Sequence, residues 1–306
     1  MSEKDTVSKK YFSDNERFAD LFNFYLYGGK QVIKPEQLRP LDSTAITLPY
    51  GEDKKVSALQ RQRDLIVSVK ADESHTYLLL AAELQSELHY AMVPRIMLYD
   101  SIQYADQIIA TAKAHKKNED KPSDNGEFLS GFFKTDKLLP VITLTVFLGA
   151  DEWDAPRTLH EMLQVEDREL LKFIPDYKLN LISPAELNDE DFGKFHTELS
   201  PVLKYLKYWL NKEKLSNVVN SDPVFRRLSF DSAVMLNTMT NSNITIKEDE
   251  ESIDMCKAIQ DLIADGKAEG KAEEKDILIE SMRKNGITEE QIKLILETEE
   301  RMSKAE

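Results

Sequence analysis

Residues 61–85, RQRDLIVSVKADESHTYLLLAAELQ, hold the pattern that decides the fold. Side chains alternate between the two faces of a strand, so Leu65, Val67 and Val69 share one face of a first arm. The matching apolar face of a second arm is formed by Leu78, Leu80, Ala82 and Leu84. The polar segment KADESHT between the arms is typical of a turn. The stretch therefore predicts a β-hairpin.

The predicted hairpin carries acids opposite its apolar faces. Asp64 begins the first arm, and Glu83 and Gln85 close the second, so folding the arms sets Asp64 roughly across from residues 81–83. Two carboxylates placed close together repel and need a shared proton or a cation. Magnesium prefers oxygen ligands and usually takes one or two protein carboxylates. The pattern favours a metal held by Asp64 and Glu83; the alternative is a polar edge-strand residue and a simple strand end.

The spacing D-x18-E-x-Q resembles the core motif of the PD-(D/E)XK nucleases, in the version found in the bacterial family of recombination-promoting nucleases and putative transposases. Further segments resemble this family in order and spacing: SDNERFADLFNFYLYGG (13–29), VIKPEQL (32–38), ELQSELHYAMVPRIMLYDSIQYADQ (83–107) and LPVITLTVFLGADEWDAPRTLHEML (139–163). The resemblance covers most of residues 10–305.

The resemblance implies an α/β (α+β mixed) fold: a restriction-endonuclease-like core, with a mixed central sheet flanked by helices, followed by a helical C-terminal region. We expect the nuclease-like core at 10–165, a helical extension at 166–246 and a charged helical tail at 247–306. The implied activity is metal-dependent hydrolysis of DNA phosphodiester bonds, linked to recombination, mobile elements or phage defence. The implied cofactor is Mg²⁺, with Mn²⁺ or Ca²⁺ as alternatives.

The resemblance implies Asp64, Glu83 and Gln85 as catalytic residues, and Gln85 departs from the general motif. The usual lysine supplies a positive charge beside the attacking water, whereas glutamine orients water without charge. Glutamine here also resembles this family's own variant. Two alternatives stay open: a catalytically inactive domesticated relative that binds DNA or protein, and a defence protein whose tail restrains or directs the nuclease.

A third metal ligand is expected from the first helix, as the resemblance to the nuclease fold implies. Asp14 matches the family pattern best, with Glu16 and Asp20 as the other choices. An Asp at this position is also an ordinary helix cap. The helix itself is predicted from a cap at Ser13 or Asp14 to Gly28-Gly29, and residues 1–12 are predicted to be a polar lead-in.

The rest of the chain predicts alternating strands and helices. We expect a strand at 43–49, a helical pattern from Ser86 to about Lys116, a strand at 140–149 that pairs in parallel through a crossover, and mainly helices from Thr158 onward. Arg61 and Arg63, which flank Asp64, are phosphate ligands or solvated residues. Arg95 is a phosphate ligand, a partner of a site carboxylate or a structural ion-pair residue.

Charge bears on the expected partner, DNA. The formal net charge is −15, whereas a nucleic-acid binder is expected to have a basic surface. Residues 1–150 carry 19 basic and 21 acidic side chains, residues 151–246 carry 11 and 16, and residues 247–306 carry 10 and 18. The acidity lies mostly in the tail, so a DNA site must be a local patch.

Composition also bounds the compartment and the chemistry. Cys256 is the only cysteine, so we expect no intrachain disulfide and a reducing cytoplasm. No apolar run approaches the roughly 18 residues of a membrane span, so no membrane partner is expected. The five histidines lack metal-ligand spacing, and no phosphate loop or catalytic-triad signature is present.

The tail, residues 247–306, predicts an exposed charged helix. A period-four repeat at 266–273 leads to a bend at Asn285-Gly286 and a short helix capped by Thr288. We expect homo-oligomerisation through these C-terminal helices, with a solvated tail as the alternative.

Overall fold

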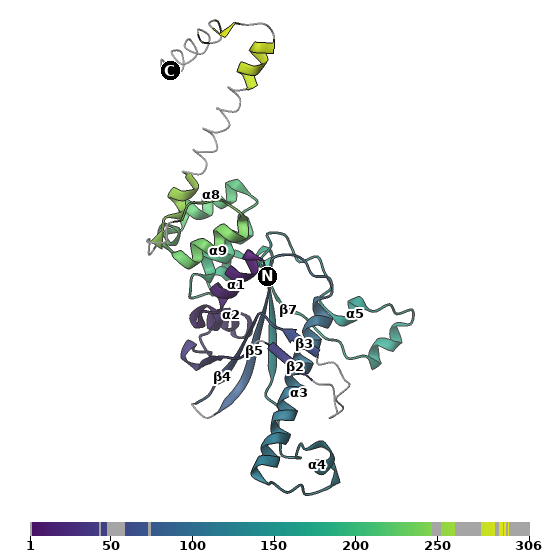
Figure 1. Ribbon diagram of the computed structural model, residues 1–306. Coiled ribbons are helices and arrows are strands. Elements are labelled where there is room, and N and C mark those ends of the chain that lie inside the picture. Colours follow the sequence, from purple (N-terminus) through teal and green to yellow (C-terminus); the bar gives the residue numbers. More distant parts are fainter. Residues whose placement is uncertain are drawn as a thin grey trace.

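The structure, a computed structural model, describes residues 2–42, 44–47, 59–72, 75–246, 252–260 and 277–284, together with residues 288, 289, 291 and 293. Within these ranges the central sheet has five strands in the order β1–β4–β5–β6–β7 (Figure 1). They are β1 (Leu38–Pro40), β4 (Leu65–Lys70), β5 (Thr76–Gln85), β6 (Val141–Phe147) and β7 (Asn180–Ile182). β1, β4 and β5 pair antiparallel, whereas β5, β6 and β7 pair in parallel. The sheet is mixed, as predicted.

β4 and β5 form the predicted hairpin. Leu65 pairs with Ala82 and Val67 with Leu80, so the apolar side chains of both arms lie on one face. That face is buried in the main hydrophobic core. The chain then crosses over through α3 and returns as β6, which pairs with β5 in the predicted parallel direction.

The numbered helices are α1 (Glu3–Phe12), α2 (Asn15–Tyr27), α3 (Met92–Asn118), α4 (Asn125–Ser130), α5 (Leu159–Met162), α6 (Asp189–Phe192), α7 (Leu199–Tyr208), α8 (Lys212–Ser221) and α9 (Phe230–Thr240). Residues 255–260 and 277–284 are helical as well. Short 3-10 turns occupy Pro35–Gln37, Arg168–Phe173, Pro184–Glu186 and Pro223–Arg226. Two small antiparallel pairs complete the fold: β2 (Thr44–Thr47) with β3 (Leu59–Gln62), and β8 (Leu228–Ser229) with β9 (Ser252–Ile253). β2 confirms the strand predicted at 43–49.

Helices cover both faces of the central sheet. On one face, side chains of α1, α2, α7 and α9 join the hairpin in a single core. On the other, Met92, Val93 and Ile96 of α3 pack near Phe147 of β6. Burial on both faces fits a sheet with parallel strands. The predicted mixed α/β fold with flanking helices and a helical C-terminal region is confirmed.

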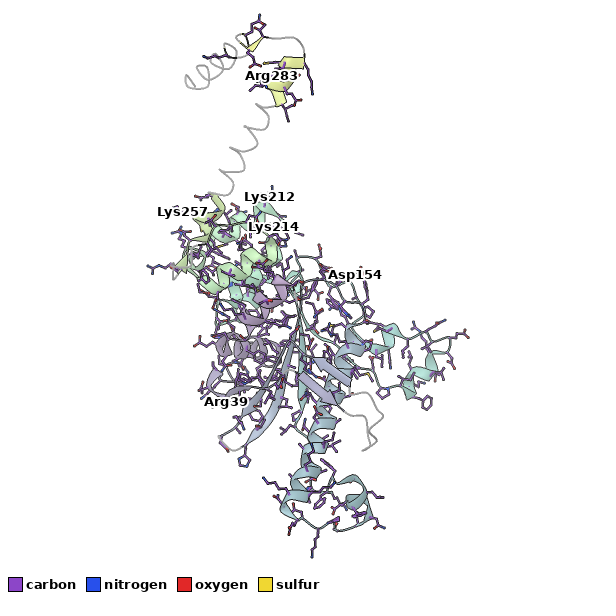
Figure 2. All side chains as sticks on the ribbon, viewed as in Figure 1. Arg39, Asp154, Lys212, Lys214, Lys257 and Arg283 are labelled. Carbon is purple, nitrogen blue, oxygen red and sulfur yellow. The ribbon has the colours of Figure 1, made fainter. Side chains whose placement is uncertain are left out.

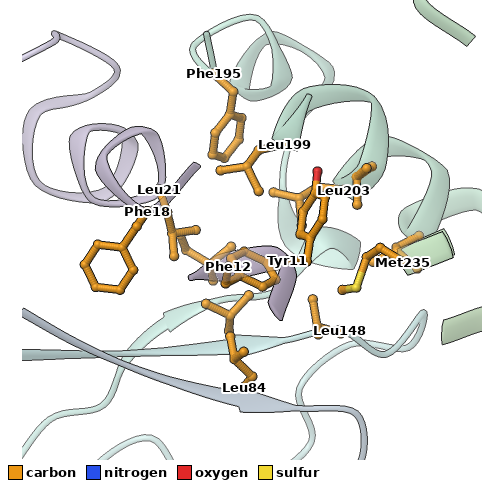
Figure 3. Packing of buried hydrophobic residues seen from close by; sticks show 14 of the residues in the cluster. Tyr11, Phe12, Phe18, Leu21, Leu84, Leu148, Phe195, Leu199, Leu203 and Met235 are labelled. Carbon is orange, nitrogen blue, oxygen red and sulfur yellow. The ribbon is translucent and has the colours of Figure 1, made fainter. Parts of the chain in front are cut away.

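The first helix was not predicted. Residues 2–12 are not a polar lead-in, because α1 forms there with a capping box in which Asp5 N donates to Ser2 Oγ and Ser2 N donates to Asp5 Oδ2. Tyr11 and Phe12 are 1% and 0% exposed. Figure 3 shows both rings between Leu84 of β5 and the helices of the C-terminal region. The large buried side chains of α1 lie at its C-terminal end, so the sequence shows only a weak helical period of apolar residues.

The second helix matches its prediction and the third begins later than predicted. Asp14 caps α2 and accepts a hydrogen bond from Arg17 N, and Gly28 ends the helix at φ 62°. α3 starts at Met92 rather than Ser86. Pro94 lies in its first turn, where a missing backbone N–H costs nothing, so it neither kinks nor divides the helix.

The segment at 166–246, predicted as a helical extension, also supplies a strand to the central sheet. β7 pairs in parallel with β6, with Thr145 opposite Leu181. Its three residues are too few to interrupt a helical pattern in the sequence. The predicted domain boundaries remain a prediction, although the sheet continues past residue 165.

The tail begins inside the core. Ile253 of β9 and Met255 are 4% and 0% exposed, and residues 255–260 are helical. Thr288 caps as predicted: Gln291 N donates to Thr288 Oγ1, and Thr288 N donates to Gln291 Oε1. The repeat at 266–273 and the bend at Asn285-Gly286 lie outside the described residues.

None of the helices in the described ranges, the 27-residue α3 included, is both long and apolar enough to cross a membrane.

Candidate functional site

The end of the central hairpin brings Asp64 and Glu83 together, as predicted. Leu65 pairs with Ala82, which sets the preceding residue, Asp64, opposite Glu83. Asp64 Oδ2 accepts a hydrogen bond of 2.8 Å from the backbone N–H of Leu84. That bond ties the Asp64 carboxylate to the strand that carries the second acid.

Glu83 is fully buried and only partly satisfied. Its Oε2 lies 3.4 Å from a guanidinium nitrogen of Arg95, while its Oε1 meets no donor in hydrogen-bond geometry among the described residues. Burial, followed by the charge of Asp64, raises the pKa of Glu83 from 4.5 to about 8. Arg95, Arg63 and the nearby Asp64 amide oppose this pKa shift less strongly. A buried carboxyl with an open oxygen is costly in the folded protein, and such groups gather at functional sites.

Two cations flank the acid pair. Lys9 Nζ of α1 lies 2.9 Å from Asp64 Oδ1. Arg95 of α3 pairs with Glu83 and donates from its Nε to Tyr99 Oη at 3.2 Å. Of the roles open to Arg95, the structure shows the pairing with a site carboxylate. Lys9 was not anticipated, because its segment was predicted to be a lead-in.

Asp64, Lys9 and Arg95 line one cavity of about 560 Å³, and Glu83 is buried behind its lining. Its lining residues are Ser2, Asp5, Lys9, Asp64, Leu84, Gln85, Ser86, Glu87, Leu88, His89 and Arg95. Gln85 is half-buried there, and its amide nitrogen donates to the carbonyl of Leu84 at 3.0 Å. The cavity is therefore lined by three acids (Asp5, Asp64 and Glu87), by Lys9 and Arg95, and by the uncharged amide of Gln85.

Asp14 is not brought to this cavity. It caps α2 and lines a different cavity, together with Glu16 and Arg17. Asp20, the remaining choice from that helix, is buried and accepts hydrogen bonds from the backbone of His196 and Thr197. In the structure Asp14 acts as a helix cap, which is the alternative role given to it above. The acid that the N-terminal helices do bring to the cavity is Asp5, from α1.

Arg63 is neither solvated nor free to bind phosphate. It is 1% exposed, pairs with Asp100 at 2.6 Å and donates to Thr143 Oγ1 at 2.7 Å. The Tyr177 hydroxyl donates to the same Asp100 carboxylate. This network joins the residue before Asp64 to α3 and β6. The side chain of Arg61 lies outside the described residues.

The acid pair fits a hard divalent cation with few protein ligands. Across the part of the chain that the structure describes, no three His, Cys, Asp or Glu side chains come together as a metal site. Magnesium needs only one or two carboxylates, because water and substrate phosphate fill its other positions. Asp64 and Glu83, whose buried Oε1 has no hydrogen-bond partner among the described residues, are the carboxylates that could serve as such ligands.

The mixed sheet, with two acids meeting at the end of its central hairpin, is consistent with the PD-(D/E)XK class of proteins. The chain belongs to the family described as "Putative transposase, YhgA-like", whose sequence profile matches residues 3–225. The family membership predicted from the sequence is thereby confirmed, and it supports a role related to mobile elements or recombination. The chain matches no curated protein and no solved structure.

Proposed function

We propose that the protein is a metal-dependent DNA endonuclease that hydrolyses phosphodiester bonds. The observation that carries the proposal is the fully buried Glu83, whose Oε1 has no hydrogen-bond donor among the described residues. It lies opposite Asp64, which lines a cavity together with Lys9 and Arg95. A buried carboxyl with an unpaired oxygen destabilises the folded protein, and a bound cation would restore that stability.

Asp64 and Glu83 would hold the cation, Mg²⁺ or Mn²⁺. When bound, such an ion activates water and stabilises negative charge on a phosphoryl oxygen. Gln85 would orient the attacking water through its amide oxygen, since its amide nitrogen is used by the Leu84 carbonyl. In the reaction, the water oxygen bonds to phosphorus and the bond to the leaving sugar oxygen breaks. The water gives up a proton to solvent, and the leaving oxygen gains one from solvent.

DNA is proposed as the substrate on local charge rather than on net charge. Lys9 and Arg95 line the cavity and would neutralise the nearest phosphates. Figure 2 shows Lys212 and Lys214 of α8, and Lys257, on the part of the folded body formed by the C-terminal helices. We expect weak binding that falls steeply with salt, because few cations are available to release counterions from an otherwise acidic protein.

The test is nicking and linearisation of supercoiled plasmid with Mg²⁺, Mn²⁺ or Ca²⁺. Wild type, Glu83→Gln and Glu152→Gln are purified in parallel, because Glu152 is an exposed acid outside the cavity. We expect cleavage by wild type and Glu152→Gln, and a loss on the order of 100-fold or more in Glu83→Gln.

Equal cleavage by all three preparations would mean a contaminant or a misplaced site. No cleavage with any ion would overturn the proposal, and DNA binding without cleavage would then favour an inactive binding module.

A further inference from the structure

The proposed site lacks a positive charge where the general motif has lysine. Gln85 is neutral, and its amide nitrogen donates to the Leu84 carbonyl. Arg95, one of the two cations in the cavity, is engaged by Glu83 and by the Tyr99 hydroxyl, and its guanidinium lies 5.5 Å from the Tyr99 ring centre. Gln85 therefore offers the attacking water no charge, and the charge of Arg95 is already engaged by Glu83.

Lys9 is the cation beside Asp64. Its Nζ is 2.9 Å from Asp64 Oδ1, and the two side chains are 23% and 12% exposed. The other oxygen, Oδ2, is held by the Leu84 amide. The ammonium group therefore occupies the open side of Asp64 and faces the cavity that Gln85 also lines.

The helix that carries Lys9 is held firmly, so this is not a chance contact of a surface lysine. α1 packs against α9 and β5, with Tyr11 and Phe12 buried between them (Figure 3). The Tyr11 hydroxyl is 3.1 Å from Ser232 Oγ of α9. The next residue, Lys10, points elsewhere: its side chain is 74% exposed and pairs with the exposed Asp231.

We propose that Lys9 is a catalytic residue that supplies the positive charge absent from Gln85. Delivered by α1 instead of by β5, its ammonium group would contact the attacking water and an oxygen of the scissile phosphate. It would lower the free energy of the negative charge that develops there. The C-terminal helical region would then contribute to catalysis indirectly, because α9 packs against α1, the helix that positions Lys9. This inference rests on the proposed nuclease function.

The test compares Lys9→Met, Lys10→Met and the double variant Lys9→Met/Gln85→Lys in the full-length chain. Plasmid cleavage gives kcat and KM, and electron paramagnetic resonance measures Mn²⁺ binding. We expect kcat to fall on the order of 100-fold in Lys9→Met, as for loss of one charge-stabilising donor. Lys10→Met should cleave within about twofold of wild type, because an exposed ion pair contributes little.

Two further results separate a catalytic charge from a structural role. Mn²⁺ affinity of Lys9→Met should equal or exceed that of wild type, because the change removes a competing cation and no ligand. The double variant should regain at least about tenfold in kcat, because it returns the charge to the position of the general motif.

Cleavage by Lys9→Met at the rate of Lys10→Met would overturn the inference, and Lys9 would merely neutralise Asp64. Loss of Mn²⁺ binding in Lys9→Met would also overturn it, by assigning Lys9 to construction of the site. A double variant as slow as Lys9→Met would show that charge is not what the site lacks. If the wild-type protein does not cleave DNA with any of the ions, the proposed nuclease function itself fails, and the catalytic role of Lys9 fails with it.

Discussion

Glu83 is held in the folded protein at a cost in stability. It is fully buried, and burial together with Asp64 raises its pKa to about 8. Replacing it with glutamine keeps the shape and removes the charge. In EDTA at pH 8, Glu83→Gln should be more stable than wild type, with a free energy of unfolding that is higher by on the order of 2–4 kcal/mol. The reason is that each unit of pKa shift corresponds to about 1.4 kcal/mol. Urea unfolding followed by circular dichroism measures the difference.

The pH profile of that difference has a definite sign. Below about pH 4.5, Glu83 is protonated in both the folded and unfolded states, so wild type and variant differ least. As pH rises from 4.5 to about 8, the unfolded chain releases the proton and the folded chain retains it, so wild-type stability falls. A difference that is constant across this range would contradict the raised pKa of Glu83.

Arg63 is expected to stabilise the folded protein, whereas Glu83 is expected to destabilise it. Removing its charge by Arg63→Met leaves the buried Asp100 without its cation, and breaking such a pair typically costs about 3–5 kcal/mol. Thermal unfolding should show this loss, whereas Lys10→Met, which breaks an exposed pair, should unfold close to wild type. A loss below about 1 kcal/mol in Arg63→Met, which is typical of an exposed ion pair, would contradict the buried pair of Arg63 with Asp100.

The residues of the site differ in how far the sequence reveals them. Asp64 and Glu83 could be placed together because a hairpin has a period of two and a register set by its apolar faces. The contact of Lys9 with Asp64 joins two elements far apart in the chain, and no local pattern encodes it. Asp14 was hard to place for a related reason: an acid at a helix start serves as a cap whether or not a site is near, and the structure shows the cap.

At the scale of elements, the end of α3 is joined to the segment after α4 by a histidine. His115 contacts Asp120 at 2.8 Å and Asp136 at 2.9 Å, and its ring stacks on Phe133 at 3.8 Å between centroids. Hydrogen bonds to Asp120 and Asp136 raise the pKa of His115 above 6.5. The contact favours the charged imidazolium, so its contribution to stability is complete below pH 6.5 and is lost as pH rises through the raised pKa.

We predict that amide protection around residues 133–136 falls as pH rises above 6.5, and that His115→Gln removes this dependence. Hydrogen exchange corrected for intrinsic rates, between pH 6 and 9, measures it. Peptides from α9 serve as the internal control, since none of these groups lies there. Protection in wild type that is independent of pH would contradict the assigned contact.

Elements with strong local signals were predicted well and the others were not. The hairpin, α2 and β6 each combine clear periodicity with turn or cap residues. The first helix is charged along most of its length, and only tertiary packing of Tyr11 and Phe12 makes it part of the core. The early start predicted for α3 arose because apolar spacing continues through 86–91, where the chain closes the site instead.

At the scale of the whole molecule, the chain ends of the folded body meet on one side of the sheet. α1 packs against α9, and β9 returns to pair with β8. The family profile ends at residue 225, yet buried side chains continue to Met255. The C-terminal helices are therefore part of the same core as the hairpin and support the helix that reaches Asp64.

This arrangement predicts where the chain can be shortened. A chain of residues 1–246 loses Ile253 and Met255, whose burial is worth about 1.5–3 kcal/mol each, so it should unfold at a lower urea concentration than a chain of residues 1–260. The longer chain should match the full-length protein, because Ile277 and Leu278 beyond it are 68% and 43% exposed. Plasmid cleavage, if α9 holds α1 as inferred, should follow stability in this series. Equal stability of the 246- and 260-residue chains would show that β9 adds nothing to the core, and α1 would then be held by α2, α9 and β5 without help from residues beyond 246.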